Sequence, residues 1–323
     1  MKKIECVWFH IPRLCLRGAD TQNGQGSTYD GGVPTYPESL LLCPVCRDPL
    51  TVNSAGQHGK KMDDGAARFL RCPRGHRFDA ARQGYFNLLT GRGTEFESDT
   101  AAMVQARVDF LGGGHFQPLA NAVSSAAESF AGNLPLVLDV GAGTGYYLKA
   151  LQERVSVSAS VALDISKYAL RRSAKELPDA LCLVCDVWRP LPVADQRVDL
   201  LLNIFAPRNV PEFARVCSDR AVALVVTPLP HHLREIAELA GLLGIRPGKA
   251  TEVATSMAEF FDVIEVRRVE FGMRLSPIDV RNVAAMGPAG HHTLRIDVDS
   301  LPPTSDVTAA FTVQVFQKRA HTS

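Results

Sequence analysis

Residues 137–146 constrain the fold of this chain more than any other segment. They read Val-Leu-Asp-Val-Gly-Ala-Gly-Thr-Gly-Tyr, an apolar strand with an aspartate that runs into three alternating glycines. Glycines at every second position let the backbone turn sharply and approach a ligand where a side chain would collide. A dinucleotide fingerprint would carry its third glycine one position later, where Tyr146 stands. The spacing favours a pocket for S-adenosylmethionine over one for NAD, with a plain strand-to-helix turn as the alternative. The residues concerned are Asp139, Gly141, Gly143 and Gly145.

Two further apolar runs end in an acid. Residues 160–163 lead into Asp164, and residues 181–185 lead into Asp186. The first interval is about the length that one helix and one turn need to return to a parallel neighbouring strand. In that arrangement Asp164 accepts from both ribose hydroxyls of the cofactor, and Asp186 accepts from the adenine amino group. Each acid is equally suited to cap the helix that follows it, but three strands that end in acids favour the cofactor pocket.

Four cysteine and histidine residues have the spacing of a metal site. Two turns, Cys-Pro-Val-Cys at 43–46 and Cys-Pro-Arg-Gly-His at 72–76, carry prolines and a glycine that bend the backbone so that neighbouring ligands face one point. Three thiolates and one imidazole complete a tetrahedral shell and leave no place for a reactive water, which predicts structural rather than catalytic zinc. The predicted ligands are Cys43, Cys46, Cys72 and His76.

Other cysteines and histidines form weaker patterns. Cys182 and Cys185 also read C-x-x-C, but they fall on a predicted strand, where side chains three apart point to opposite faces. We therefore expect two core thiols there. The histidine pairs at 231–232 and 291–292 diverge on any regular element, so only one member of each pair can face a given site.

Composition and length exclude several classes of protein. The chain has 323 residues, 46% of them hydrophobic and 21% charged, which is enough for more than one domain with a full core. No apolar run approaches the roughly 20 residues of a membrane helix, and His10, Pro12 and Arg13 interrupt the start, which argues against a signal peptide. The prediction is a cytoplasmic protein without membrane contact.

The net charge of +1 means that any binding of nucleic acid must depend on local charge. Residues 43–92 carry nine Lys and Arg against four acids, with Phe78, Tyr85 and Phe86 interleaved. Cations of this kind bind phosphates, and aromatic rings stack unpaired bases. The segment is therefore a predicted RNA-binding surface, although for any single arginine a solvated surface position is the better interpretation.

The chain divides into four predicted regions. Residues 1–39, rich in Gly, Thr and Pro, predict a disordered extension, and residues 40–89 hold the zinc-binding, RNA-recognition module. Residues 90–133 show helical spacing and predict a helical connector that covers the cofactor mouth. Residues 134–323 alternate strands and helices as a doubly wound sheet requires, with an antiparallel edge strand at 309–316. The predicted fold class is α/β: a class I, Rossmann-like methyltransferase with a mostly parallel seven-stranded sheet and a small N-terminal zinc-ribbon-like module.

A series of short motifs follows a fixed order between residues 42 and 318. Besides the metal ligands and the glycine loop, the series comprises the segments 78–79, 84–89, 103–107, 114–119, 163–167, 205–207, 227–233 and 273–275. In this order the motifs resemble one family, the bacterial 23S rRNA guanine-N1 methyltransferases, including the tylosin-resistance type. Ordered agreement over most of the chain is far more specific than any single motif.

The resemblance implies methylation at N1 of a guanine in the hairpin 35 loop of 23S rRNA, at nucleotide 745 or 748, with macrolide (tylosin) resistance as a linked property. It also implies a homodimer and cofactor contacts from an aromatic residue at Phe116 and from His232. Members of the family can have a tyrosine at the position of Phe116, so packing of the ring on the cofactor is kept here and a hydrogen bond from a hydroxyl is lost. The alternative role of Phe116 is that of a core residue at the start of a helix. The predicted cofactor-binding residues are Phe116, Asp139, Gly141, Gly143, Gly145, Tyr146, Tyr147, Asp164, Asp186 and His232.

The reaction requires that a nucleophilic nitrogen be held in line with the methyl group, and positioning is its main demand. Asn203, Phe205 and Pro207 follow a predicted strand at the place where such enzymes orient the target base. Phe205 can stack on an extruded base, or it can pack at the strand end. No residue is assigned as general base. The alternative functions are methylation of another RNA or of a small molecule, and a zinc-ribbon binding protein without activity.

Overall fold

The computed structural model describes residues 36–37, 39–54, 68–91, 93–240, 242, 244–287, 290 and 296–320. These residues belong to one compact unit, Tyr36–Ser323. The predicted extension over residues 1–39 lies almost entirely outside the described residues, and so does the histidine pair at 291–292. Among the described residues, no helix has both the length and the apolar character that a membrane span needs.

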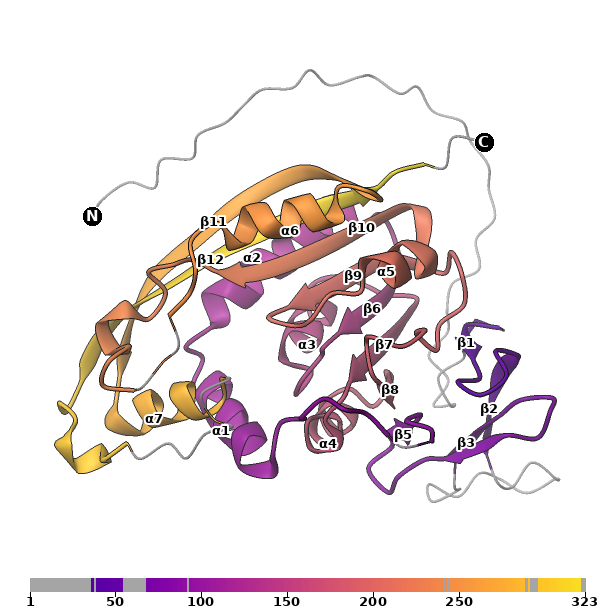
Figure 1. Ribbon diagram of the computed structural model, residues 1–323, viewed down its shortest axis with the longest axis horizontal. Coiled ribbons are helices and arrows are strands. Elements are labelled where there is room, and N and C mark those ends of the chain that lie inside the picture. The colour runs from indigo at the N-terminus through magenta and orange to yellow at the C-terminus, as the bar shows by residue number, and fades with distance from the viewer. Residues whose placement is uncertain are drawn as a thin grey trace. The chain divides into compact units, whose positions relative to one another are not determined.

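In the described part of the chain, eight strands form one sheet in the order β11-β12-β10-β9-β6-β7-β8-β5 (Figure 1). The strands from β10 to β5 run parallel to one another, and β12 runs antiparallel to both of its neighbours, β10 and β11. The prediction of a mostly parallel Rossmann-like sheet is confirmed, but the predicted count of seven strands is wrong. An eighth strand, β5, comes from the predicted zinc-binding module and pairs with β8. The bounds are β5 Phe86–Asn87, β6 Leu136–Val140, β7 Ala159–Asp164, β8 Leu181–Val184, β9 Val198–Ile204, β10 Cys217–Pro228, β11 Phe261–Leu275 and β12 Ser305–Lys318.

One strand position differs from the prediction. The segment 309–316 is antiparallel as expected, but β12 lies between β10 and β11 and is not an edge strand. Its polar residues Thr312 and Gln314 are buried, and the Gln314 amide donates to the carbonyl of Ala250 in a covering helix (3.1 Å). Since both faces of β12 are covered, its alternation of polar and apolar residues does not mark a solvent face. The edge belongs to β11, whose residues are mostly exposed or half-buried.

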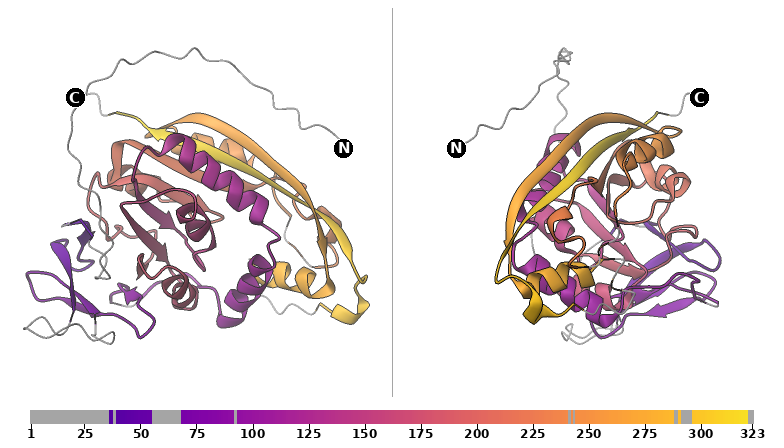
Figure 2. Two further views of the ribbon diagram at one scale, coloured as in Figure 1. Left: turned by 180° about the vertical axis from the view of Figure 1, so that it is seen from behind. Right: turned by 60° about the vertical axis from the view of Figure 1, so that its left-hand side comes forward.

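Helices cover both faces of this sheet, and its side chains alternate between two cores. One face carries α1, α2, α3, α4 and α7; Figure 2 shows α2 in front of the sheet when the molecule is seen from behind. The other face carries α5 and α6. The bounds are α1 Ala101–Gly112, α2 Gln117–Phe130, α3 Tyr146–Gln152, α4 Lys167–Glu176, α5 Val210–Val216, α6 Lys249–Met257 and α7 Pro277–Ala285.

The helix starts follow local sequence chemistry. Thr100 caps α1 and Ser166 caps α4, because each hydroxyl accepts from a backbone N–H in the first turn. Ser276 and Asp279 form a capping box at α7, where Pro277 begins the helix. Ser166, and not Asp164, is therefore the cap of α4, which removes the capping interpretation of that acid.

A second, smaller sheet lies within residues 39–54 and 68–91. Its strands β1 (Leu41–Leu42), β2 (Pro49–Ser54), β3 (Arg68–Arg71) and β4 (Arg77–Asp79) pair antiparallel in chain order. Buried residues of this sheet share one core with α5, α6 and the large sheet. Beyond the small sheet, β5 adds to the edge of β8, and the Arg47 guanidinium donates to the carbonyl of Leu191 (2.9 Å). The small module is thus packed on the methyltransferase fold and is not a separate globule.

Candidate active site and metal centre

The four predicted metal ligands come together in the small module. Their ligand atoms all lie within 4.8 Å of one another. The Cys46 and Cys72 sulfurs are 3.7 Å apart, and His76 Nδ1 is 3.6 Å from the Cys43 sulfur and 3.3 Å from the Cys72 sulfur. With Zn–S bonds of about 2.3 Å and Zn–N bonds of about 2.0 Å, tetrahedral coordination requires S···S separations of about 3.8 Å and S···N separations of about 3.5 Å. The donor set and its spacing therefore fit zinc.

Two turns hold these ligands in place. The backbone N–H of Arg47 donates to the carbonyl of Cys43 (2.9 Å), and the N–H of Gly75 donates to the carbonyl of Cys72 (2.9 Å). Gly75 has φ +87°, a left-handed conformation that glycine adopts without strain. Each C-x-x turn thereby directs its ligands to one point, as the sequence predicts.

The glycine loop joins the carboxyl end of β6 to α3. Gly141 has φ +81°, and a Cβ built there would lie 2.2 Å from the Cβ of Ala206. Gly145, with φ +80°, is the N-cap residue of α3, and a Cβ on it would meet Leu177 at 2.8 Å. The backbone therefore runs against its neighbours at two points where only glycine fits. The loop is a cradle of the kind that admits a cofactor close to the main chain.

Two carboxylates flank this cradle. Asp139 is fully buried near the end of β6, and burial, together with the charge of Asp164, raises its pKa to about 8. Asp164 accepts from the backbone N–H of Gly143 (2.8 Å) and of Ser166 (2.7 Å). Burial raises the pKa of Asp164 above its ordinary value, and those two hydrogen bonds oppose the rise. The two acids are suited to bind polar and cationic groups of a ligand at this edge.

Asp186, the third predicted acid, lies just beyond the last residue of β8, Val184, and is buried. One carboxylate oxygen accepts from the backbone N–H of Trp188 (3.0 Å), and the other accepts from the Thr94 hydroxyl (2.9 Å). The second contact joins Asp186 to a segment 92 residues earlier in the chain, which nothing in the sequence indicated.

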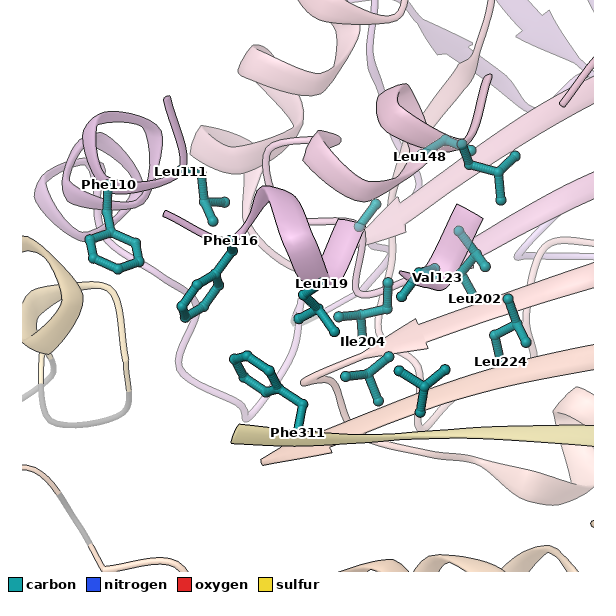
Figure 3. Close-up of a cluster of buried hydrophobic side chains, with 14 of the residues drawn as sticks. Phe110, Leu111, Phe116, Leu119, Val123, Leu148, Leu202, Ile204, Leu224 and Phe311 are labelled. Atoms are coloured by element: carbon teal, nitrogen blue, oxygen red, sulfur yellow. The ribbon is translucent and has the colours of Figure 1, made fainter. Parts of the chain in front are cut away.

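A group of aromatic rings lies in the core next to the start of α3, and Figure 3 shows Phe110, Phe116 and Phe311 of this group. Phe116 packs edge-on against Phe311, with ring centroids 5.1 Å apart, and His232 lies 4.5 Å from the same ring. Phe116 is 2% exposed and directly precedes α2, so it is a core residue at a helix start as well as a neighbour of His232. Phe311, fully buried at the centre of the group, was not singled out from the sequence, because a phenylalanine in an apolar strand has no distinguishing signal.

His232 is neutral under physiological conditions. Burial, and to a lesser extent the charge of His231, lowers its pKa to about 4. Its Nδ1 accepts from the backbone N–H of Ala310 (3.1 Å), which assigns the ring proton to Nε2. The neutral ring therefore has one N–H available as a donor.

The predicted target-base residues follow β9. The Asn203 amide donates to the carbonyls of Val140 (3.3 Å) and Pro207 (2.9 Å), so its buried side chain fixes the turn at 204–207. Phe205 has φ +55°, is 45% exposed, and lies 5.4 Å from Phe311. Its ring therefore packs at the strand end against Phe311 and Tyr147 and is also partly exposed to solvent.

The two tyrosines at the start of α3 differ in their surroundings. The Tyr146 hydroxyl donates to the Gln117 side chain (3.3 Å). The Tyr147 hydroxyl is buried and has no hydrogen-bond partner among the residues that the structure describes, and its ring lies 6.2 Å from that of Phe205. A buried hydroxyl without a partner is costly, and a polar ligand group at this place would satisfy it. This atom, together with the glycine cradle, fits the polar part of S-adenosylmethionine.

Arg107 is a site residue that the sequence did not single out, although it ends the motif at 103–107. Its guanidinium pairs with Asp99 and donates to the carbonyl of Met286 (2.7 Å). A Cβ built on Gly143 would lie 3.6 Å from the same guanidinium. Arg107 thus joins α1 to the glycine loop and places a fixed cation beside the cofactor cradle.

Comparisons with known proteins agree with this arrangement. A model of the family described as "RlmA, N-terminal", a zinc ribbon, matches residues 41–91, and a methyltransferase domain model matches residues 137–225. A Micromonospora griseorubida protein, provisionally named a 23S rRNA (guanine-N1)-methyltransferase, is 41% identical over 85% of this chain and 97% of its own length. The chain belongs to the 23S rRNA (guanine-N1)-methyltransferase family. The 23S rRNA (guanine(748)-N1)-methyltransferase of Streptomyces fradiae is 38% identical over 85% of this chain and 95% of its own length.

Family membership and geometry agree on the two cofactors. The methyltransferase domain requires S-adenosylmethionine, and the zinc ribbon contains the described Cys and His cluster. A Bacillus subtilis relative, also provisionally named a 23S rRNA (guanine-N1)-methyltransferase, is 30% identical over 63% of this chain and 70% of its own length. The family resemblance predicted from ordered motifs is confirmed.

Proposed function

We propose that this chain methylates N1 of guanine 748 in the hairpin 35 loop of 23S rRNA, and that it does so in the cytoplasm. The observation that carries the proposal is the partly exposed ring of Phe205, which lies near Tyr147 at the end of the glycine loop. The sheet that holds this site also shares a core with the zinc ribbon. The name of the Streptomyces fradiae relative supports position 748 over 745.

We assign cofactor binding to the carboxyl edge of the sheet. The glycine loop would let the cofactor approach the backbone. Asp164 and Asp186 would accept from its hydroxyl and amino groups, and Tyr147 and neutral His232 would offer hydrogen-bond donors. When bound, S-adenosylmethionine supplies a methyl group on a positively charged sulfur for in-line displacement. Phe116 and Phe311 exclude water from this region, because both rings are buried. The residues assigned to the cofactor are Phe116, Asp139, Gly141, Gly143, Gly145, Tyr146, Tyr147, Asp164, Asp186 and His232.

We assign orientation of the target guanine to the turn after β9. Asn203 fixes this turn through the carbonyl of Pro207, and Phe205 stacks on the extruded base. Extrusion costs less from a hairpin loop than from a duplex. The N1 proton is released to solvent water as N1 takes up the methyl group, and no side chain is assigned as its acceptor.

The zinc ribbon would bind the RNA backbone through its cations. The expectation that its aromatic rings stack on bases is wrong. Phe86 is fully buried and Phe78 and Tyr85 pack against the cores, so the interleaved rings do not form a stacking surface. Arg74 and Arg77 pair with acids at the surface but remain largely exposed. Arg71 and Arg82 are exposed as well, whereas Arg47 and Arg68 are partly buried. The cations at 60, 61 and 92 lie outside the described residues.

Burial of Asp139 predicts a pH dependence of stability. Its pKa is near 4 in an unfolded chain and about 8 in the ligand-free fold, so the folded state holds a proton that the unfolded chain has released. The contribution of this proton to stability is fully present below about pH 4 and is lost progressively as pH rises from about 4 to about 8. We expect Asp139→Asn, which stays neutral, to raise the ligand-free melting temperature by about 4 °C or more at pH 9 and by a much smaller amount at pH 5. Equal shifts at both pH values would contradict the buried carboxyl.

The position of methylation is tested by reverse transcription. Unmodified 23S rRNA, lacking its own N1 methyl group in hairpin 35, would be incubated with the protein and S-adenosylmethionine. An N1 methyl group blocks Watson–Crick pairing, so we expect a new stop that corresponds to guanine 748. A stop at 745 would correct the position, and label transferred to a metabolite but not to RNA would favour the small-molecule alternative.

Growth of a tylosin-sensitive strain that expresses the chain would test the linked resistance, and light scattering would test the proposed homodimer.

A further inference from the structure

Two exposed aromatic rings lie outside the site assigned above. Among the large apolar side chains that the described residues expose, four are aromatic: Phe96, Phe130, Trp188 and Phe205. Phe96 and Trp188 are 52% and 51% exposed and lie together, with ring centroids 6.3 Å apart and planes inclined by 39°. They come from segments far apart in the chain, so their pairing is a tertiary feature.

The backbone that carries this ring pair is held by one buried carboxylate. Asp186 accepts from the N–H of Trp188 and from the Thr94 hydroxyl, and the Thr94 oxygen accepts from the N–H of Phe96 (3.1 Å). The Arg189 guanidinium donates to the carbonyls of Thr90 (3.3 Å) and Gly93, which adds a second link between the segments. Two rings fixed in advance lose little conformational entropy when they bind a partner.

The ring pair lies on the same edge of the sheet as the proposed target-base site. Trp188 follows β8, and Phe205 follows β9, three strand positions away in the sheet order. At about 4.8 Å per strand, this interval is on the order of 14 Å. The Asn209 amide donates to the carbonyl of Val187 (2.9 Å), which joins the loop after β9 to the residue before Trp188. The pair is therefore near the reacting base but too far to be part of its pocket.

The charges around the rings favour one kind of partner. Glu95, which is exposed, directly precedes Phe96 in sequence, and its negative charge disfavours a phosphate at this place. A neutral base face that stacks on the rings avoids this repulsion. Arg189, about half exposed, supplies a cation next to Trp188 for the adjoining backbone.

We infer that Phe96 and Trp188 form a stacking site for an unpaired base of the substrate RNA loop, other than the guanine that is methylated. This inference rests on the proposed function and adds a second recognition point to it. Two anchored bases fix the direction of the loop across the sheet edge, so the site would select the RNA and not merely hold it.

Fluorescence gives a direct test because the chain has two tryptophans, Trp8 and Trp188. Trp8→Phe leaves Trp188 as the sole reporter. We expect a hairpin 35 RNA without cofactor to quench its emission by half or more, and S-adenosylmethionine alone to leave it unchanged. Quenching by the cofactor alone, with weaker cofactor binding by Trp188→Ala, would assign the rings to the adenine pocket and overturn the inference.

Kinetics provide the second test. We expect Trp188→Ala and Phe96→Ala to raise KM for the RNA about tenfold each, with kcat and cofactor affinity nearly unchanged. Trp188→Phe, which keeps a ring, should stay within about threefold of the parent, and Phe130→Ala is the matched exposed-ring control on α2. Unchanged KM in folded alanine variants, together with silent fluorescence on binding, would reject the stacking site while methylation continues. Failure of the parent protein to methylate the RNA at all would instead reject the proposed function.

Discussion

Gly141→Ala is expected to abolish detectable binding of S-adenosylmethionine, with an increase in Kd of at least about 100-fold. The added Cβ would lie 2.2 Å from the Cβ of Ala206, a separation that neither backbone can tolerate without moving. The left-handed conformation at φ +81° adds about 1–2 kcal/mol of strain. Movement of either segment displaces the cradle or the turn that carries Phe205, so cofactor binding and methyl transfer should both fail. Calorimetric titration with the cofactor measures the loss.

Two control variants distinguish the effect of the clash with Ala206 from the effect of backbone strain at residue 141. Gly132→Ala carries a similar strain at φ +70° but has nothing within 4 Å of the added Cβ, so it should bind the cofactor normally. The double variant Gly141→Ala with Ala206→Gly removes the overlapping methyl group and should recover part of the affinity. If Gly141→Ala itself binds the cofactor as well as the parent protein, the close approach of these two segments is not what shapes the pocket.

Removal of one metal ligand should greatly reduce methylation of RNA and leave the binding of S-adenosylmethionine in place. Cys72→Ser is expected to lower the zinc content from one ion per chain to nearly none and to reduce methylation of RNA by at least about 100-fold. Structural zinc contributes about 10–16 kcal/mol to the folding of small zinc peptides, far more than the small ribbon sheet can supply alone. Because the ribbon shares a core with α5 and α6, the melting temperature should fall as well.

Cys182→Ala is the matched control, since Cys182 is buried in the opposite core and takes no part in the metal cluster. It should retain one zinc per chain by atomic absorption. Cofactor binding by Cys72→Ser should persist at low temperature, because the glycine loop lies on the large sheet. Full zinc content in Cys72→Ser would contradict the assigned ligand set. Deletion of the ribbon is a poorer test than this point variant, because β5 pairs with β8 in the large sheet.

Local patterns predicted the parts of the fold that depend on neighbouring residues. The glycine spacing indicates a tight turn because close approach of the backbone requires glycine there, and the C-x-x-C spacing indicates metal because few other arrangements use that chemistry. Cys182 and Cys185 belong to opposite cores, as strand geometry requires. In each case the relevant physics acts within a few residues.

The features that sequence missed depend on contacts between distant segments. β12 pairs with both β10 and β11, and its polar residue Gln314 is buried against α6, which the alternation in the strand does not reveal. Phe86 was expected to face RNA, but pairing of β5 with β8 buries it. The contact of Arg107 with the glycine loop, and the bond from Thr94 to Asp186, likewise join segments whose proximity only the folded chain establishes.

Mass mapping of a hairpin 35 RNA, after incubation with the zinc-loaded protein and S-adenosylmethionine, tests the proposed function most directly. We predict one added methyl group, on N1 of the guanine at position 748, and no addition when Gly141→Ala replaces the parent protein. An unmodified guanine in RNA that the active protein has bound, or a methyl group on another atom of the base, would contradict it.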